Sequence, residues 1–259
     1  MDEISLKNAL AGLNLPSIHY LVTVGSTNDY ALELAEDGAV DGTLVVADEQ
    51  TRGRGRLDRR WLTPAASALA FSLALRPSPA ERERLGLFAP LCGVAVCAAL
   101  RHNYGLEAEI KWPNDVLLAR RKTCGILVEA HWLGSEPQVV IAGIGVNVTP
   151  ASVPPAPDLL FPATCVEEHL GRHVQREELL AAILAQFASW RPKMGSPEFM
   201  ACWEAWLAFK GEMVSVTGPA GSLFGRVLGV ALDGSLRLET GAGAEQSVSA
   251  GDVRLRPAV

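Results

Sequence analysis

The sequence of 259 residues predicts an α+β fold, in which one large mixed or antiparallel β-sheet with helices is followed by a small C-terminal β-barrel. Strand-like runs follow one another at hairpin spacing between residues 106 and 148, and amphipathic helical segments flank them. From residue 211 onward the pattern changes to short alternating strands with Gly and Asp-Gly turns. We therefore expect two domains, at residues 1–210 and 211–259.

The first half of the chain alternates strand and helix patterns. Ile18–Val24 has strand character, and Ser26, Thr27 or Asn28 can cap a helix that closes at Gly38. Further along this half we expect strands at Thr43–Gln50 and Ala68–Leu75, and a buried helix over residues 85–102 that ends near Gly105.

The second half begins with three strand-like runs: "AEIKWPNDVLL", "TCGILVEAHWL" and "QVVIAGIGVNV". The proline-rich residues 150–162 cannot form regular structure, and we expect a long surface loop of the kind that often covers a site. Arg176–Trp190 places its apolar residues on one helical face. A second helical stripe follows at Phe199, Trp203, Trp206 and Leu207.

Composition limits the function classes. The net charge of −6 speaks against a broad nucleic-acid surface. The acidic start lacks the features of a secretory signal, and the longest apolar run, residues 85–100, is short for a membrane span. Five cysteines without a CxxC pair suit reduced thiols, so we expect a cytoplasmic protein without membrane contact. His169 and His173 lie in a polar segment that favours a solvated helix face over a metal site.

One local segment is strongly basic. Residues 49–61, "EQTRGRGRLDRRW", are called the arginine loop from here on. Its two glycines let the backbone approach a ligand closely, and Arg54, Arg56 and Arg59 supply forked donors for carboxylate or phosphate oxygens. A mobile basic surface loop explains this run equally well. The chain has neither common phosphate-binding glycine motif, so side chains would have to hold a nucleotide.

Two further segments place polar residues at strand ends. Lys111 and Asp115 bracket a "WPN" tripeptide, and this segment alone indicates a simple turn in which Asn114 and Asp115 bond to the local backbone. Lys122 precedes Gly125 and an apolar strand, and a lysine in such a place usually protects a sheet edge. Neither segment alone indicates a functional site.

The order of the segments changes this interpretation. Five blocks resemble, in order and spacing, the signatures of biotin protein ligases: "GSTN" (25–28), "EQTRGRGR" (49–56), "KWPNDV" (111–116), "KTCGILVE" (122–129) and "GIGVNV" (143–148). The resemblance continues through "PATCVEEHLG" into the final barrel and so covers nearly the whole chain. It implies the mixed sheet shared by class II aminoacyl-tRNA synthetases and biotin ligases, with an SH3-like C-terminal barrel.

The resemblance also implies a reaction in two steps. The biotin carboxylate attacks the α-phosphate of ATP and gives biotinyl-5'-AMP, and a lysine of a biotin carboxyl carrier domain, as in acetyl-CoA carboxylase, then attacks the mixed anhydride. Mg²⁺ is expected to arrive with ATP, because no carboxylate cluster is dedicated to a metal. Fewer than about 20 residues precede the first strand, too few for a helix-turn-helix domain, so we expect a monofunctional ligase that does not bind DNA, either a monomer or a homodimer.

Roles for individual residues follow from the same resemblance. The residues expected to bind biotin are Ser26, Thr27, Asn28, Gln50, Gly53, Arg54, Arg56, Lys122 and Gly125. The residues expected to bind the nucleotide are Arg54, Arg56, Arg59, Trp61, Asn114 and Asn147. The residues expected to serve catalysis are Lys122, Arg56, Asp115 and Lys111. For Asp115 the implied role is to help deprotonate the acceptor lysine, and no residue is expected to bind a metal.

The arginine loop departs from the commonest form in this family. Asp58 stands where a glycine is usual, and Leu57 where a basic residue is frequent. Asp58 would bring a negative charge near the phosphates, partly offset by Arg59 and Arg60. Three alternatives therefore stay open: a lipoate- or octanoate-type ligase of the same fold, a nucleic-acid-binding module, and an inactive scaffold in which Asp58 disables the loop.

Overall fold

The structure is a computed structural model that describes residues 1–57, 59–155, 161–218, 221–241, 243–249 and 254–257. The predictions that concern Asp58, and those for residues 156–160 of the proline-rich loop, lie outside the described residues.

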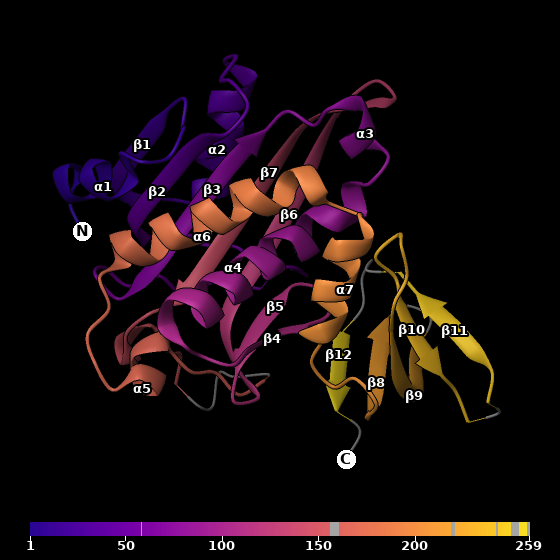
Figure 1. The fold of residues 1–259 in the computed structure, drawn as a ribbon. Coiled ribbons are helices and arrows are strands. Elements are labelled where there is room, and N and C mark those ends of the chain that lie inside the picture. The colour runs from indigo at the N-terminus through magenta and orange to yellow at the C-terminus, as the bar shows by residue number, and fades with distance from the viewer. Residues whose placement is uncertain (58, 156–160, 219–220, 242, 250–253, 258–259) are drawn as a thin grey trace.

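A mixed sheet of seven strands forms the larger part of the fold (Figure 1). The strand order is β1-β2-β3-β7-β6-β5-β4, and only β1 and β2 run parallel. The strands are β1 (Ile18–Val24), β2 (Thr43–Gln50), β3 (Ala68–Leu75), β4 (Ala108–Lys111), β5 (Asp115–Leu118), β6 (Arg121–Leu133) and β7 (Glu136–Asn147). The predicted α+β architecture with a mixed sheet is confirmed.

The strand run expected around "KWPND" is two strands, which corrects the prediction of a single one. β4 and β5 form a tight antiparallel hairpin, in which Lys111 pairs with Asp115. The turn between them holds Pro113, which cannot donate to a ladder, and Asn114, whose Nδ2 donates to the Ile126 carbonyl at 2.6 Å. This hairpin sets Lys111 and Asp115 side by side at the edge of the sheet.

Helices cover both faces of the sheet. α4 (Phe88–Tyr104) and α6 (Arg176–Trp190) pack together on one face, and α2 (Thr27–Glu36) packs on β2, β3 and β7 from the other. Residues of β2 alternate between the two: Leu44 and Val46 belong to the core under α4, and Val45 to the cluster under α2.

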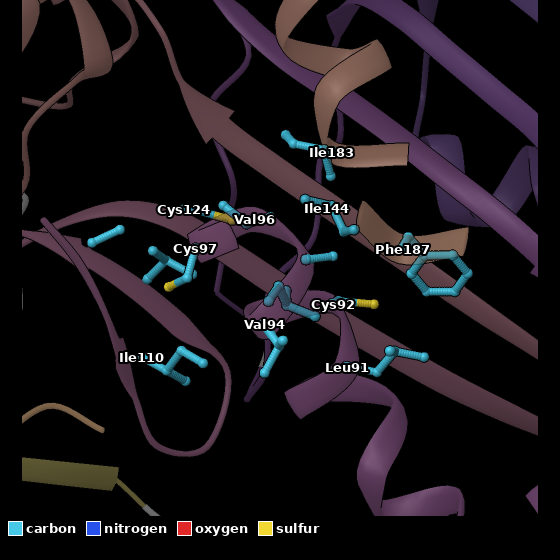
Figure 2. Packing of buried hydrophobic residues seen from close by; sticks show 14 of the residues in the cluster. Leu91, Cys92, Val94, Val96, Cys97, Ile110, Cys124, Ile144, Ile183 and Phe187 are labelled. Atoms are coloured by element: carbon cyan, nitrogen blue, oxygen red, sulfur yellow. The ribbon is translucent and has the colours of Figure 1, made fainter. Parts of the chain in front are cut away.

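α4 is the expected buried helix. Gly105 ends it in a left-handed conformation with φ of 66°, as the sequence predicted. Leu85–Tyr104 is long and apolar enough to cross a membrane, but 72% of its most apolar stretch is buried in the fold. Figure 2 shows α4 side chains, among them Cys92, packed with Ile144 of the sheet and Phe187 of α6. Burial raises the pKa of the Cys92 thiol to about 12, so this cysteine is an inert core residue.

The remaining helices are α1 (Glu3–Leu10), α3 (Pro79–Arg82), α5 (Val166–Leu170) and α7 (Pro197–Ala205), with short 3-10 turns at η1 (Leu85–Leu87), η2 (Pro150–Ser152) and η4 (Arg191–Lys193). The sequence analysis missed α1, although Asp2 and Ser5 form a capping box and Leu6 and Leu10 are buried. It was also wrong that the proline-rich loop has no regular structure, because η2 is a helical turn.

A second, antiparallel sheet of five strands follows α7 (Figure 1). Its order is β11-β10-β9-β8-β12, with β8 (Met213–Gly218), β9 (Gly221–Val230), β10 (Leu236–Glu239), β11 (Glu245–Val248) and β12 (Arg254–Pro257). The sheet is tied to the β4–β5 hairpin, because the buried Trp112 donates from Nε1 to the Gly234 carbonyl at 3.0 Å. The small C-terminal β unit is thus confirmed, and its boundary at residue 210 stays a prediction.

Candidate active site

A pocket lies where the arginine loop crosses the sheet, between the start of α2, the β4–β5 hairpin and strands β6 and β7. Most of the predicted site residues line it: Ser26, Thr27, Asn28, Gln50, Arg54, Arg56, Arg59, Trp61, Lys111, Asn114, Asp115, Lys122 and Gly125. Two predicted residues lie elsewhere. Gly53 is placed inside the fold of the arginine loop, and Asn147 lines an adjoining cavity. The structure therefore brings together residues from distant parts of the chain.

One end of the pocket is neutral and rich in hydrogen bonds. Ser26 caps α2, and this places Thr27 in the first turn. Gln50 Oε1 accepts from the backbone N–H of Thr27 at 2.8 Å and lies 3.0 Å from its hydroxyl. Gln50 Nε2 donates to Thr63 at 3.1 Å. These bonds fix the orientation of the Gln50 amide and present paired donors and acceptors to a neutral polar group.

A buried serine supports this neutral end. The Ser72 hydroxyl on β3 lies 2.7 Å from Asn28 Oδ1 and 2.8 Å from the Thr27 hydroxyl. Asn28 Oδ1 can only accept, so Ser72 donates its proton there. The sequence analysis missed Ser72, because an isolated serine in an apolar strand gives no signal of a partner 45 residues away.

Glycines form the floor of the pocket. Gly125 on β6 pairs with Gly145 on β7, and the indole of Trp61 lies against both. A Cβ at Gly145 would lie 2.3 Å from Trp61 Nε1, and one at Gly125 would lie 2.9 Å from the same ring. At Gly143, two residues along the same face of β7, a Cβ would lie 2.1 Å from Asn28 Oδ1. The "GIGVNV" glycines, which fail as a nucleotide fingerprint, thus keep the sheet surface flat.

The arginine loop folds back on itself as an irregular hairpin. The Trp61 N–H donates to the Gly53 carbonyl at 2.9 Å, and the Gly55 N–H to the Arg59 carbonyl at 2.7 Å. A Cβ at Gly53 would lie 2.4 Å from the Trp61 carbonyl oxygen, so this position requires glycine. Leu57 takes a left-handed φ of 57°, which is uncommon for leucine.

The other end of the pocket is cationic and centres on one carboxylate. Asp115 lies 2.6 Å from Lys122 Nζ and 3.1 Å from Lys111 Nζ. Burial would raise the pKa of Asp115, but Lys122 and Lys111 outweigh it and hold this pKa well below its usual range. Burial lowers the pKa of Lys111. A carboxylate with so low a pKa is a poor proton acceptor, so Asp115 is suited to hold the two lysines and not to act as a base.

A second cavity adjoins the cationic end. Lys122 and Asp115 line it on one side, and Asn147, Phe161 and Arg256 on the other. The buried Asn147 donates from Nδ2 to the Thr164 carbonyl at 3.1 Å. The Phe161 ring lies between two cations, 5.1 Å from Lys111 Nζ and 5.4 Å from Arg256 Cζ.

Sequence reasoning missed Phe161 and Arg256. Arg256 arrives from β12 of the C-terminal sheet, and no local pattern announces that contact. The same analysis expected Arg56 and Asn114 to act together on a ligand, and the structure places Arg56 Nη1 3.4 Å from Asn114 Oδ1.

Arg54 is placed differently from the expectation. Its guanidinium bonds to both oxygens of Glu129, at 2.8 and 2.9 Å, and to Asp29 at 2.7 Å. Burial opposes the charge, but the bonds to Glu129 and Asp29 prevail and raise the pKa of Arg54. In this arrangement its charge is matched by protein carboxylates, so Arg54 holds the arginine loop to β6 and α2.

Among the residues that the structure describes, no group of three or more His, Cys, Asp or Glu side chains could hold a metal ion. The site therefore offers a neutral hydrogen-bonding end, a flat glycine floor and an end with two lysines around one carboxylate. These features suit an elongated ligand with a neutral polar head and an anionic tail that reacts next to further anions.

Comparison with known families gives two matches along the chain. Residues 21–147 match the Biotin/lipoate A/B protein ligase family. Residues 210–256 match the Biotin protein ligase C terminal domain. The first match contains almost the whole of the pocket, and the second contains Arg256.

Individual relatives agree with these matches. The chain is 34% identical over 256 residues to the bifunctional ligase/repressor BirA of Bacillus subtilis, a match that covers 98% of this chain and 77% of that protein. It is 33% identical to the biotin--[acetyl-CoA-carboxylase] ligase of Mycobacterium tuberculosis, covering 98% and 95%. The solved structure of an Aquifex aeolicus biotin protein ligase with biotin and ATP superposes with a TM-score of 0.80 at 30% identity, covering 94% of this chain and all of that one.

Proposed function

The chain belongs to the biotin protein ligase family, and we propose that it activates biotin with ATP to biotinyl-5'-AMP and transfers the biotinyl group to a lysine of a biotin carboxyl carrier domain. The observation that supports this most strongly is the contrast between the two ends of the pocket. Thr27 and Gln50 suit the ureido ring of biotin, and Lys122 at the opposite end suits its carboxylate.

The first step must bring two anions together. A carboxylate oxygen of biotin attacks the α-phosphorus of ATP, the bond to the bridging oxygen breaks, and pyrophosphate leaves with the electron pair. Repulsion between the anions is strong in a site that excludes water, so fixed cations lower the barrier. We assign this role to Lys122 and Lys111, both held by Asp115, and to Arg56 of the arginine loop.

The second step attacks the acyl carbon of the anhydride. The neutral amine of the carrier lysine adds to the carbonyl, the bond to the AMP oxygen breaks, and AMP leaves. The amine loses a proton in the process, and the strongly lowered pKa of Asp115 makes this residue a poor acceptor for it. We therefore assign Asp115 to holding the two lysines in both steps.

The nucleotide is assigned to the cationic end and the adjoining cavity. Asn147, Phe161 and Arg256 line that cavity, and Trp61 and Arg59 separate it from the biotin end. Mg²⁺ is expected to arrive with the triphosphate, because the only carboxylate of the described cavity walls, that of Asp115, is already paired with two lysines.

The test is transfer to a carrier domain. The protein is incubated with ATP, Mg²⁺, biotin and a biotin carboxyl carrier domain, and the intact mass of the carrier is measured. We expect a gain of one biotinyl group that requires ATP, and no gain would refute the proposal. Replacing biotin by lipoate or octanoate distinguishes the alternative ligases, because a dithiolane ring or an alkyl chain offers no partner to Gln50 and Thr27. Location in the cytoplasm and the oligomeric state stay predictions.

A further inference from the structure

One carboxylate outside the predicted site joins three segments of the pocket wall. Glu129 Oε1 and Oε2 accept from the Arg54 guanidinium at 2.8 and 2.9 Å, and Oε2 also accepts from Asn28 Nδ2 at 2.7 Å. Glu129 belongs to β6, Arg54 to the arginine loop, and Asn28 to the first turn of α2. The side chain of Glu129 is 27% exposed, so water screens this contact less than it screens a surface ion pair.

The same carboxylate connects to the neutral end of the pocket through Asn28. Asn28 Nδ2 faces the acceptors of Glu129 and Leu127, so its Oδ1 is turned to Ser72, which donates at 2.7 Å. Ser72 in turn contacts the hydroxyl of Thr27 at 2.8 Å. A continuous chain of hydrogen bonds thus leads from the proposed ureido site to the arginine loop. Every donor along it has a defined acceptor.

We propose that Glu129 is a positioning residue that couples ligand binding at Thr27 and Gln50 to the closed position of the arginine loop. The proposal rests on the proposed function. A ligand that bonds to Thr27 and Gln50 fixes the polar chain through Ser72 and Asn28, and a fixed Asn28 holds the Glu129 carboxylate where it grips Arg54. By reciprocity, a loop held by Glu129 favours the bound ligand.

Glu129 is the main partner of Arg54 in this arrangement, and Asp29 is the weaker one. Glu129 accepts two parallel hydrogen bonds from the guanidinium, whereas Asp29 accepts one. The side chain of Asp29 is also 46% exposed. A bidentate pair with a less exposed carboxylate is the stronger of the two.

The first experiment measures release of biotinyl-AMP from Glu129→Gln. The amide keeps the size of the side chain but loses the charge, so we expect release about tenfold faster than from the unaltered protein. Glu129→Asp, which keeps the charge, should recover part of the loss. The matched control is Glu136→Gln, because Glu136 pairs with Arg82 at 2.7 Å at a site that does not line the pocket. Release at the original rate from Glu129→Gln would overturn the proposal.

A double-mutant cycle separates positioning from a structural role. If Glu129 acts through Arg54, Glu129→Gln adds almost nothing to the effect of Arg54→Gln on the release rate. A general loss of structure would instead add to that effect and lower the melting temperature of both single variants together. Additive effects would contradict the coupling.

A readout that needs no adenylate keeps this inference separate from the proposed function. The arginine loop offers several trypsin sites, so a loop that Glu129 no longer holds should be cut faster in the ligand-free protein. We expect Glu129→Gln to speed tryptic cleavage within residues 49–61 several-fold, with Glu136→Gln unchanged. If the unaltered protein makes no biotinyl-AMP, the proposed function fails; if cleavage is unchanged, the role of Glu129 fails.

Discussion

The two ends of the pocket differ in how they are built. Hydroxyl and amide groups of α2, β2 and β3, all from the first 72 residues, form the neutral end. The cationic end draws Lys111, Asp115 and Lys122 from the middle of the chain, and Arg256 from the last strand. The neutral end is therefore one local network, whereas the cationic end depends on long-range packing. Changes at the first should reduce recognition, and changes at the second should reduce reaction.

The largest effect is expected at the cationic end from Lys122→Ala. Loss of this ammonium removes the cation closest to Asp115 at 2.6 Å, and we expect adenylate formation to slow about 10²- to 10³-fold. Biotin affinity should fall far less. Pre-steady-state release of pyrophosphate measures the first quantity and calorimetry the second. Lys210→Ala is the control, since Lys210 pairs with Glu204 outside the pocket. Equal losses in rate and affinity would remove the distinction between the two ends.

Asp115→Asn should have the next largest effect and should also destabilise the fold. It leaves the buried Lys111 without its carboxylate partner, and breaking such a buried pair costs about 3 kcal/mol or more. We expect adenylate formation to slow about tenfold or more, because both lysines lose their common anchor. Urea unfolding measures the first effect and single-turnover kinetics the second.

The pH dependence of that stability loss follows from the lowered pKa of Asp115. A carboxylate with a lowered pKa in the folded state stabilises fully above its unfolded value of about 3.9, and this contribution is lost as the pH falls through the folded-state pKa. The stability difference between the protein and Asp115→Asn should therefore be constant between about pH 5 and 7 and shrink in stronger acid. A difference that grew on acidification would contradict the assignment of charge.

Gly145→Ala tests the floor between the two ends. The new Cβ would lie 2.3 Å from Trp61 Nε1, so the indole must move off the sheet. We expect biotin affinity to fall about tenfold, with the loss shared by later steps. Gly12→Ala is the matched control, because a Cβ there meets no atom within 4 Å. Unaltered biotin binding by Gly145→Ala would show that the floor lies outside the biotin site.

The smallest effect of the set is expected from Arg56→Ala. This arginine lies on the arginine loop 3.4 Å from Asn114, a long contact, and the core does not depend on it. We expect biotinyl-AMP to dissociate several-fold faster while the melting temperature hardly changes. Stopped-flow displacement of the adenylate provides the measurement, and a larger change in melting temperature than in release would assign Arg56 to folding instead.

The sequence predicted best what local patterns specify. The bounds of α6 and the left-handed end of α4 at Gly105 follow from apolar spacing and a glycine, and both are confirmed. The resemblance to biotin ligases selected most of the residues that line the pocket. The sequence analysis missed residues whose role depends on a distant partner: Ser72, Glu129, Phe161 and Arg256.

The role of Arg54 shows the physical reason for this limit. Its residue type and neighbours indicate an anion site, but they do not say which anion occupies it. Glu129 lies 75 residues further along the chain, and only the register of β6 against β7 brings its carboxylate to the arginine loop. Register depends on the whole sheet, so a short motif cannot encode it.

The most direct test of the two-ended pocket is calorimetric titration with biotin, first alone and then with ATP and Mg²⁺, followed by mass analysis of the bound ligand. The account predicts that biotin binds alone through the neutral end, and that biotinyl-AMP is recovered once ATP is present. It also predicts that Lys122→Ala still binds biotin but yields little adenylate. Absence of biotin binding to the unaltered protein, or full adenylate formation by Lys122→Ala, would contradict it.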